Sequence, residues 1–358
     1  FYVNELKRSG EWKSVSKSVQ LNLKSMGSSL VDVLDDFSRG KKENKIEKVN
    51  YINRDVRQEL NDLEDYDVIF MQGGATLQFS LIPMNFAHLG EISNFADVGS
   101  WSAKAIKEAS KICNVNICTS SKEKNYTNID LISDWNIKEN SALVHYCKNE
   151  TIQGIRITEE PKFSSYSFVD MSSCLFSEDI DVTKYDFIYA CAQKNFGPSG
   201  ITLVIAKKEL LEKSNPDLPN ILKYDAHANE GSMLNTPNTF GWYVAGKMFD
   251  WYLENGGVAE MEKQSIAKTA MLYDLIDKSD FYLNPVNPEQ RSINNVVFTI
   301  VNSELEKVFL DEAEKADLRY LKGHRTVGGM RASIYNSMKI ESVSALKDFM
   351  ESFEKNYG

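Results

Sequence analysis

The stretch YACAQKNFGPSG at residues 189–200 carries a single lysine, Lys194, from an apolar run into a glycine-rich loop. A second apolar run, ITLVIA at 201–206, follows the loop at once. Short apolar runs bounded by glycine and proline are typical of buried strands. The pattern therefore predicts two strands joined by a rigid turn, with a cation at the carboxyl end of the first strand.

Other apolar runs of the same kind lie on the N-terminal side of this stretch. They are YDVIFM (66–71), SALVHYC (141–147) and YSFVDM (166–171), while the run that leads to Lys194 itself begins earlier, as FIYACA (187–192). Segments with helical periodicity separate several of them. One is 102–112, where Ala105, Ile106, Ala109 and Ile112 can share a face. Strands that are apolar on both faces and alternate with helices predict an α/β fold, with helices covering a mostly parallel sheet.

The pattern changes after 241–257, a helix that ends in two glycines. A long helix at about 260–278 is followed by strand-like runs at 294–301 and 330–336 and by an amphipathic C-terminal helix. The apolar positions of that last helix are Val343, Leu346, Phe349, Met350 and Phe353. We expect a large domain over 1–259 and a smaller α+β domain over 260–358, with the extreme N-terminus a candidate to pack on the small domain.

Composition narrows the class of protein. Of the 358 residues, 42% are hydrophobic and 26% are charged, as in ordinary soluble proteins. The net charge of −10 argues against nucleic acid or an anionic membrane as the main partner. No apolar run approaches the ~20 residues of a membrane-spanning helix. Five cysteines, an odd number without zinc-type spacing, favour reduced thiols in a cytoplasmic protein with no metal site.

Three features follow predicted strands at their carboxyl ends, where open α/β sheets bind ligands. In MQGGATLQF (71–79), Gly73 and Gly74 precede a helix that starts near Thr76, an arrangement that can bind an anion. Asp170 ends one apolar run and Lys194 follows another. Each has an ordinary alternative: a tight turn, a capping aspartate and a surface lysine.

Taken together, the three features suit pyridoxal phosphate. That cofactor needs an anion site for its phosphate, a carboxylate beside its ring nitrogen and an amine for a Schiff base. The interval from Asp170 to Lys194 allows one crossover to a neighbouring strand, which would place both groups around one ring. Trp101 could supply a flat face for the ring, or could be an ordinary core aromatic.

Five segments resemble the phosphoserine aminotransferase family, a group of class V pyridoxal-phosphate-dependent aminotransferases with the aspartate-aminotransferase fold (fold type I). They are HYCKNETIQGI (145–155), CAQKNFGPSG (191–200), NTPNTF (235–240), NGGVAEM (255–261) and KGHRTVGGMRASIYN (322–336). The resemblance runs from about Asp35 to Gly358. The last segment and the Gln-Lys-Asn block are highly specific in combination.

The resemblance implies roles for residues around the cofactor. Lys194 matches the Schiff-base lysine, which also moves the proton between the substrate Cα and C4′ of the cofactor. Asp170 matches the partner of the ring nitrogen, Trp101 the stacking aromatic, and Thr151 the threonine near the ring hydroxyl. Contacts on the phosphate side are implied for Ala75, Thr76 and Gln193.

The resemblance also implies a homodimer with shared active sites and two anionic substrates. Asn235 and Thr236 match residues that reach the phosphate of the other subunit's cofactor. Arg331 matches the arginine for the substrate α-carboxylate. The cluster implied for the distal phosphate or carboxylate is Arg39, His324 and Arg325. The implied reaction converts L-glutamate and 3-phosphohydroxypyruvate to 2-oxoglutarate and O-phospho-L-serine in serine biosynthesis, with a related vitamin B6-pathway substrate as a further possibility.

Two departures from the family pattern touch the substrate end of the site. The N-terminal FYVNELKRSGEWKSV lacks the family's Gly-Pro, and Ser38-Arg39-Gly40 stands where many members have His-Arg-Gly. They leave open a homologue that binds the cofactor but has altered or lost turnover and acts as an interaction protein. A cysteine desulfurase is a second alternative, and it would need a reactive loop cysteine, for which Cys118 is the one candidate.

Overall fold

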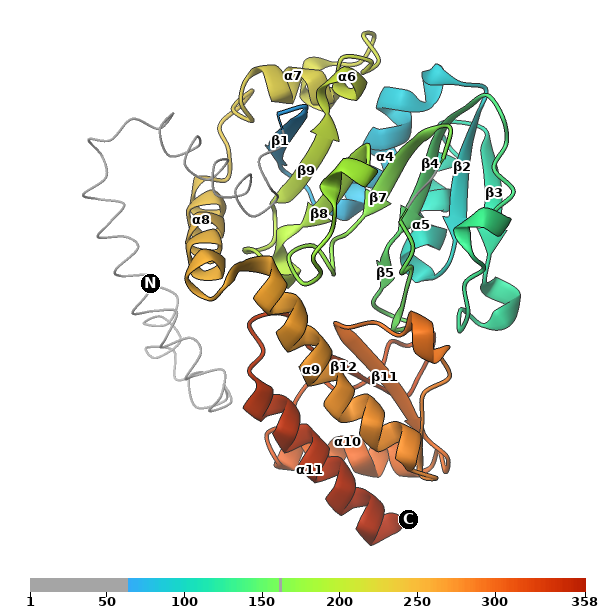
Figure 1. The fold of residues 1–358 in the computed structure, drawn as a ribbon, viewed down its shortest axis with the longest axis vertical. Helices are drawn as coiled ribbons and strands as arrows, with labels where there is room; N and C mark the ends of the chain where they lie inside the picture. Colours follow the sequence, from blue (N-terminus) through green and yellow to red (C-terminus); the bar gives the residue numbers. More distant parts are fainter. Residues whose placement is uncertain (1–63, 161–162) are drawn as a thin grey trace, which may run out of the picture.

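A seven-stranded sheet in the order β1-β9-β8-β7-β4-β2-β3 forms the centre of the larger part of the molecule. The structure, a computed structural model, describes residues 64–160 and 163–358 (Figure 1). The strands are β1 (Tyr66–Met71), β2 (Ile92–Asp97), β3 (Val115–Ser120), β4 (Ser141–Cys147), β7 (Tyr166–Asp170), β8 (Phe187–Cys191) and β9 (Thr202–Lys207).

Within this sheet only β9 runs against its neighbours, because it is antiparallel to both β1 and β8. The loop at 192–201 is too short for the crossover that a parallel neighbour requires, so β8 and β9 form a hairpin. The other six strands point the same way, so their carboxyl ends share one edge of the sheet. The expected mostly parallel α/β architecture is confirmed.

The five strands of this sheet predicted from apolar runs are all present, with ends that differ by no more than one residue, whereas the run predicted at 330–336 is a strand only over β12 (Met330–Ser333). Two further strands, β2 and β3, were not predicted because polar residues interrupt them. Asn94 in β2 is fully buried, and its side-chain oxygen accepts hydrogen bonds from Asn116 Nδ2 at 2.8 Å and Lys138 N at 3.1 Å. These distant partners satisfy its side-chain oxygen, and no local sequence pattern indicates them.

Helices cover both faces of the sheet. They are α4 (Ala75–Phe86), α5 (Ser100–Ala109), α6 (Lys208–Leu211), α7 (Tyr224–Asn229) and α8 (Thr239–Glu254). Buried residues of α4 to α7 share one core with one face of the sheet, and α8 packs into a second core on the other face. The helix predicted at 102–112 begins and ends earlier, and Ile112 lies beyond its end and is exposed.

The C-terminal part, in the lower half of Figure 1, has its own sheet and core. Its elements are α9 (Gly257–Lys278), β10 (Tyr282–Leu283), β11 (Asn295–Ile300), α10 (Leu305–Lys315), β12 (Met330–Ser333) and α11 (Ile340–Tyr357). The three strands are antiparallel in the order β10-β11-β12. The apolar face predicted for the C-terminal helix packs into this core.

Helix α9 connects the two cores. Val258 and Met261 in its first turns belong to the core beneath α8, whereas Leu272 and Ile276 belong to the core of the C-terminal sheet. We therefore propose two domains that meet within α9, close to the boundary at 259/260 expected from the sequence. The expectation that the extreme N-terminus packs on the small domain concerns residues outside the described part of the chain.

Candidate active site

Lys194 lies in a short turn of 3₁₀ helix (Ala192–Lys194) that follows β8. The next residue, Asn195, holds this turn in place. Its side-chain amide donates to the carbonyl of Leu175 at 2.9 Å and to Ser177 Oγ at 2.8 Å. Its backbone carbonyl accepts a hydrogen bond from the Tyr252 hydroxyl at 2.9 Å. The lysine is therefore carried by a turn fixed to two other segments of the large domain.

Asp170 ends β7 and lies on the strand next to the one that leads to Lys194. Its side chain is 4% exposed and accepts a hydrogen bond from Ser172 N at 2.8 Å. Burial raises the pKa of Asp170, while the charge of Lys194 and the hydrogen bonds from Ser172 and Tyr189 act in the opposite direction. The charged form of the buried Asp170 carboxylate is therefore stabilised by these neighbours.

The charge of Lys194 depends on its surroundings in the same way. Burial by itself lowers the pKa of Lys194, but Tyr335, Cys191 and Asp170 together outweigh burial, and the pKa is raised. Among these, Asp170 is the carboxylate at the end of the adjacent strand. Asp170 and Lys194 therefore stabilise each other's charged form.

Trp101, in the first turn of α5, lies beside this pair. The Lys194 Nζ is 5.5 Å from the centroid of the Trp101 ring. The indole Nε1 of Trp101 donates to Thr151 Oγ1 at 3.0 Å, and Arg331 Nη1 donates to the carbonyl of Thr151 at 3.4 Å. Arg331 belongs to β12, so a side chain of the small domain contacts the loop that holds Thr151.

The glycine loop lies at the same edge of the sheet. Gly73 and Gly74 have φ values of 112° and 110°, which favour glycine, and α4 begins directly after them. Gly74 N donates to Thr202 Oγ1 at 2.8 Å. The helix start predicted near Thr76 is confirmed, and Ala75 and Thr76 provide the first backbone amides of α4.

Three other residues expected near a phosphate are exposed. Gln193 precedes Lys194 in its turn, and Asn235 and Thr236 lie in the segment before α8. The Gln72 side chain, which precedes the glycine loop, donates to the carbonyl of Thr236 at 3.2 Å. Thr236 is therefore next to the start of this subunit's own glycine loop.

The distal cluster is only partly within the described chain. His324 and Arg325 lie in the loop before β12, where His324 Nδ1 is 2.8 Å from Thr326 Oγ1 and Arg325 is exposed. In the described residues, neither side chain forms a hydrogen bond or ion pair with Lys194, Asp170 or Arg331. Arg39 and Ser38 lie outside the described residues.

Sequence reasoning missed the residues that fasten Trp101. Glu150, 1% exposed, accepts hydrogen bonds at the start of α5 from Trp101 N at 2.9 Å and from Ser102 N and Oγ at 2.7 Å each. Gln153 binds Ser100 through both its amide oxygen (3.2 Å) and its amide nitrogen (2.7 Å). A Cβ on Gly99 would lie 2.4 Å from the Glu150 side chain, so only glycine fits there.

In the segment NETIQG, the family resemblance predicted a role for Thr151 but none for Glu150. The capping role of Glu150 depends on a contact between loops that are about fifty residues apart, and the local sequence does not show it. Burial raises the pKa of Glu150, and the hydrogen bonds from Ser102 and Trp101 oppose this shift. These hydrogen bonds therefore stabilise the charged form of Glu150 beside the first backbone amides of α5.

Cys118 does not fit a reactive loop cysteine. It lies in β3, is 4% exposed, and burial raises the pKa of its thiol to about 12. The expectation that it occupies a loop is wrong, because residues 115–120 form an edge strand despite their polar positions. All five cysteines are free, and the described residues contain no cluster of three or more residues of metal-ligand type.

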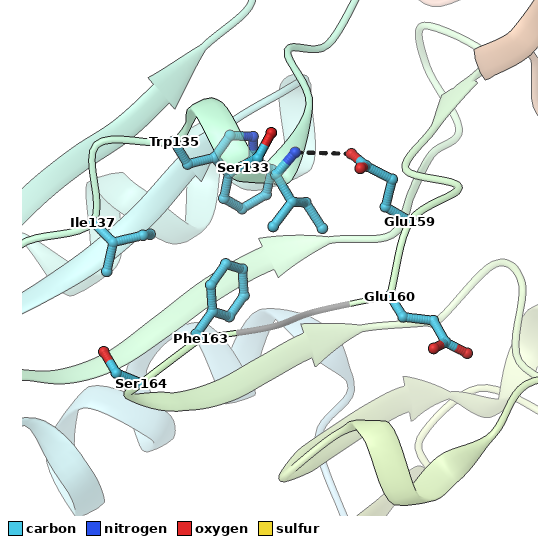
Figure 2. A pocket seen from close by; sticks show the side chains of 8 residues that line it. Ser133, Trp135, Ile137, Glu159, Glu160, Phe163 and Ser164 are labelled. Carbon is cyan, nitrogen blue, oxygen red and sulfur yellow. Dashed lines mark hydrogen bonds between the residues drawn. The ribbon is translucent and has the colours of Figure 1, made fainter.

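A cavity of the described chain lies away from these residues. Figure 2 shows this cavity, of about 690 Å³, between residues 132–137 and Glu159, Glu160 and Phe163. The carboxylate of Glu159 is engaged, since it accepts a hydrogen bond from Ile132 N at 2.8 Å. None of the candidate residues lines this cavity, and two carboxylates at its wall disfavour an anionic ligand.

Comparison with known proteins agrees with this geometry. The family of class-V aminotransferases matches residues 35–346. The chain belongs to this family. The phosphoserine aminotransferase of Acinetobacter baylyi is 46% identical over 310 residues, which are 85% of each chain. The family resemblance inferred from the sequence is therefore confirmed.

Two solved structures extend the comparison. The phosphoserine aminotransferase of Bacillus circulans subsp. alkalophilus superposes with a TM-score of 0.86 at 37% identity, covering 89% of each chain. A pyridoxal-phosphate-bound phosphoserine aminotransferase from Trichomonas vaginalis gives a TM-score of 0.82 at 33% identity, covering 87% of this chain and 89% of that one. The expected fold type I aminotransferase architecture is confirmed.

No helix in the described residues is long and apolar enough to cross a membrane.

Substitution of Glu150 tests whether its hydrogen bonds hold Trp101 and the start of α5 in place. Glu150→Ala should lower the free energy of unfolding by about 2 kcal/mol, because two amides at the start of α5 lose their acceptor. Glu150→Gln should cost less, because it keeps one acceptor oxygen. Urea unfolding followed by circular dichroism measures both effects.

Glu108→Ala is the matched control on the same helix. Glu108 forms an exposed ion pair with Lys111, so its loss should cost less than ~0.5 kcal/mol. Equal losses in Glu150→Ala and Glu108→Ala would contradict the capping role of Glu150.

Proposed function

We propose that this protein is a pyridoxal-phosphate-dependent transaminase that converts L-glutamate and 3-phosphohydroxypyruvate to 2-oxoglutarate and O-phospho-L-serine. The observation that carries the proposal is the grouping of Asp170, Lys194 and Trp101 at the carboxyl edge of a fold type I sheet. Relatives named phosphoserine aminotransferase at 46% identity over most of the chain support the choice of substrates.

The residues present fit the cofactor. Asp170 is a buried carboxylate suited to a protonated ring nitrogen, and Lys194 is an amine in the turn that follows the adjacent strand. The start of α4, after Gly73 and Gly74, offers backbone amides to a phosphate. Pyridoxal phosphate bound here supplies an electron sink for the bond broken at the substrate Cα.

The chain's own residues supply the remaining functions. Asp170 holds the proton on the ring nitrogen, and Lys194 Nζ moves the proton at the substrate Cα. Trp101 stacks on the ring, and Thr151 orients both Trp101 and Arg331 through the hydrogen bonds that it makes to them. On the phosphate side, the proposal assigns contacts to Ala75, Thr76 and Gln193.

Positive charges select the substrates. Arg331 binds the α-carboxylate that donor and acceptor share, since a guanidinium pairs with a carboxylate through two parallel hydrogen bonds. We assign His324, Arg325 and Arg39 to the distal group, which is a carboxylate in glutamate and a phosphate in the acceptor. The same cluster could accept a related phosphorylated substrate of the vitamin B6 pathway.

The proposal includes a homodimer. Asn235 and Thr236 are exposed, as are the apolar side chains of Leu77, at the start of α4, and Phe240, at the start of α8. A second subunit seated here would cover these apolar groups, and Asn235 and Thr236 would then contribute to its phosphate site. We also propose a cytoplasmic location, in keeping with five reduced cysteines.

The proposed substrates can be tested directly. In a coupled assay with L-glutamate as donor, kcat/KM for 3-phosphohydroxypyruvate should exceed that for pyruvate by at least about a hundredfold, because two charge-assisted hydrogen bonds are at stake. Comparable use of both acceptors would contradict the distal phosphate site. No turnover of either would favour the alternative of an interaction protein that binds the cofactor.

Arg325 is the most exposed member of the distal cluster in the described chain, and it gives a sharper test of that cluster. Arg325→Ala should lower kcat/KM for 3-phosphohydroxypyruvate at least about tenfold, because one charge-assisted hydrogen bond is lost. Arg319→Ala is the control, since Arg319 pairs with exposed Asp317 in the same region. A loss in Arg325→Ala no larger than in Arg319→Ala would remove Arg325 from the substrate site.

A further inference from the structure

Two buried polar side chains lie behind Asp170 and have no role in the reaction as described. Tyr189 on β8 is the residue directly opposite Asp170 in the pairing of β7 with β8, and its hydroxyl is close enough to the Asp170 carboxylate to favour the charged form of that carboxylate. His145 on β4 follows, with its Nε2 2.9 Å from the Tyr189 hydroxyl oxygen. The three side chains therefore lie in a row across three neighbouring strands, with a hydrogen bond between His145 and Tyr189.

Packing against neighbouring rings holds the His145 and Tyr189 side chains in place. The His145 ring lies 5.0 Å from the Phe95 ring and 5.9 Å from the Tyr189 ring, at interplanar angles of 32° and 27°, and Phe79 packs edge-on against it at 6.4 Å. Tyr189 is fully buried and His145 is 1% exposed. Water therefore does not compete for these hydrogen bonds, and the rings have little room to turn.

Burial also fixes the protonation state of His145. It lowers the pKa of His145 to about 3, so the ring is neutral and carries a single N–H. Its Nδ1 is buried and has no hydrogen-bond partner, whereas its Nε2 faces Tyr189. A buried N–H without an acceptor is costlier than a buried lone pair without a donor. The proton therefore resides on Nε2.

This tautomer sets the direction of the chain. His145 Nε2–H donates to the Tyr189 oxygen, so the Tyr189 proton is available to Asp170. The reverse direction would orphan an N–H on Nδ1 and leave Asp170 without its Tyr189 donor. Burial raises the pKa of Tyr189 well above its usual range, so the phenol keeps its proton.

We propose that His145 and Tyr189 are positioning residues that orient the Asp170 carboxylate through a one-way hydrogen-bond chain, from His145 Nε2–H to the Tyr189 oxygen and from the Tyr189 hydroxyl to Asp170. The chain supplies Asp170 with a neutral donor from behind, so the carboxylate remains charged and faces the ring nitrogen of the cofactor. The role of this orientation rests on the proposed function, but the chain itself is a property of the protein without cofactor.

The tautomer is tested first, without reference to activity. Nitrogen-15 NMR of histidine-labelled, cofactor-free protein should show the His145 proton on Nε2. The protein has only four histidines, and His145→Gln identifies the signal. A proton on Nδ1 would overturn the proposal.

The hydroxyl is tested by Tyr189→Phe, which keeps the ring and removes the donor to Asp170. The dissociation constant for pyridoxal phosphate, measured by equilibrium dialysis, should rise at least about tenfold, the effect of losing one hydrogen bond to a charged group. Tyr282→Phe is the control, because it removes another buried hydroxyl, one that donates to the Met350 carbonyl in the small domain. Equal dissociation constants in the two variants would overturn the proposal.

Two substitutions of His145 separate hydrogen bonding from packing. His145→Gln replaces the Nε2–H with an amide N–H and should keep cofactor affinity within about threefold of wild type, whereas His145→Phe keeps an aromatic ring without the donor and should weaken it more. The opposite order would show that His145 acts by packing and would overturn the proposal. An Nε2–H tautomer in a protein without transaminase activity would instead count against the proposed function and support the chain itself.

Discussion

The structure depends on two opposite charges at the carboxyl edge of the large sheet, the buried carboxylate of Asp170 and the half-buried ammonium of Lys194. A buried carboxylate or ammonium is costly unless a partner of opposite charge is near. Here each group offsets the burial of the other. Removing either one would leave the other as an uncompensated charge, so the two are held by elements that cannot move independently.

The fold achieves this through adjacent strands and a fixed turn. β7 ends at Asp170, and the neighbouring β8 leads to Lys194 in a turn held by Asn195. The small domain is fastened to the same place, since Asn336, just after β12, donates to the Tyr252 hydroxyl at 2.8 Å, and that hydroxyl in turn donates to the Asn195 carbonyl. Arg331 on β12 is thereby brought against the loop that holds Thr151.

Much of this arrangement could be predicted from the sequence, because it is local. Apolar runs marked the strands that end at Asp170 and precede Lys194, and Gly73 and Gly74 marked the start of α4. Family resemblance, and not periodicity, indicated Thr151 and Arg331, which join the site only through tertiary contacts.

Features that depend on contacts between distant segments could not be predicted. The cap formed by Glu150 on α5 and the hydrogen bond between His145 and Tyr189 join residues on separate loops or strands. The edge strand β3 was missed because its polar residues conceal it, and that led to the wrong placement of Cys118. The order of the strands, which makes Asp170 and Tyr189 neighbours, is a property of the whole sheet.

The most direct test is to find which lysine binds the cofactor. Borohydride reduction of the protein with pyridoxal phosphate, followed by proteolysis and mass spectrometry, should place the pyridoxyl group on Lys194. Two other lysines in the described chain, Lys148 and Lys268, are each 2% exposed and serve as internal comparisons. A pyridoxyl group on Lys148, on Lys268 or on any surface lysine, with Lys194 unmodified, would contradict the account.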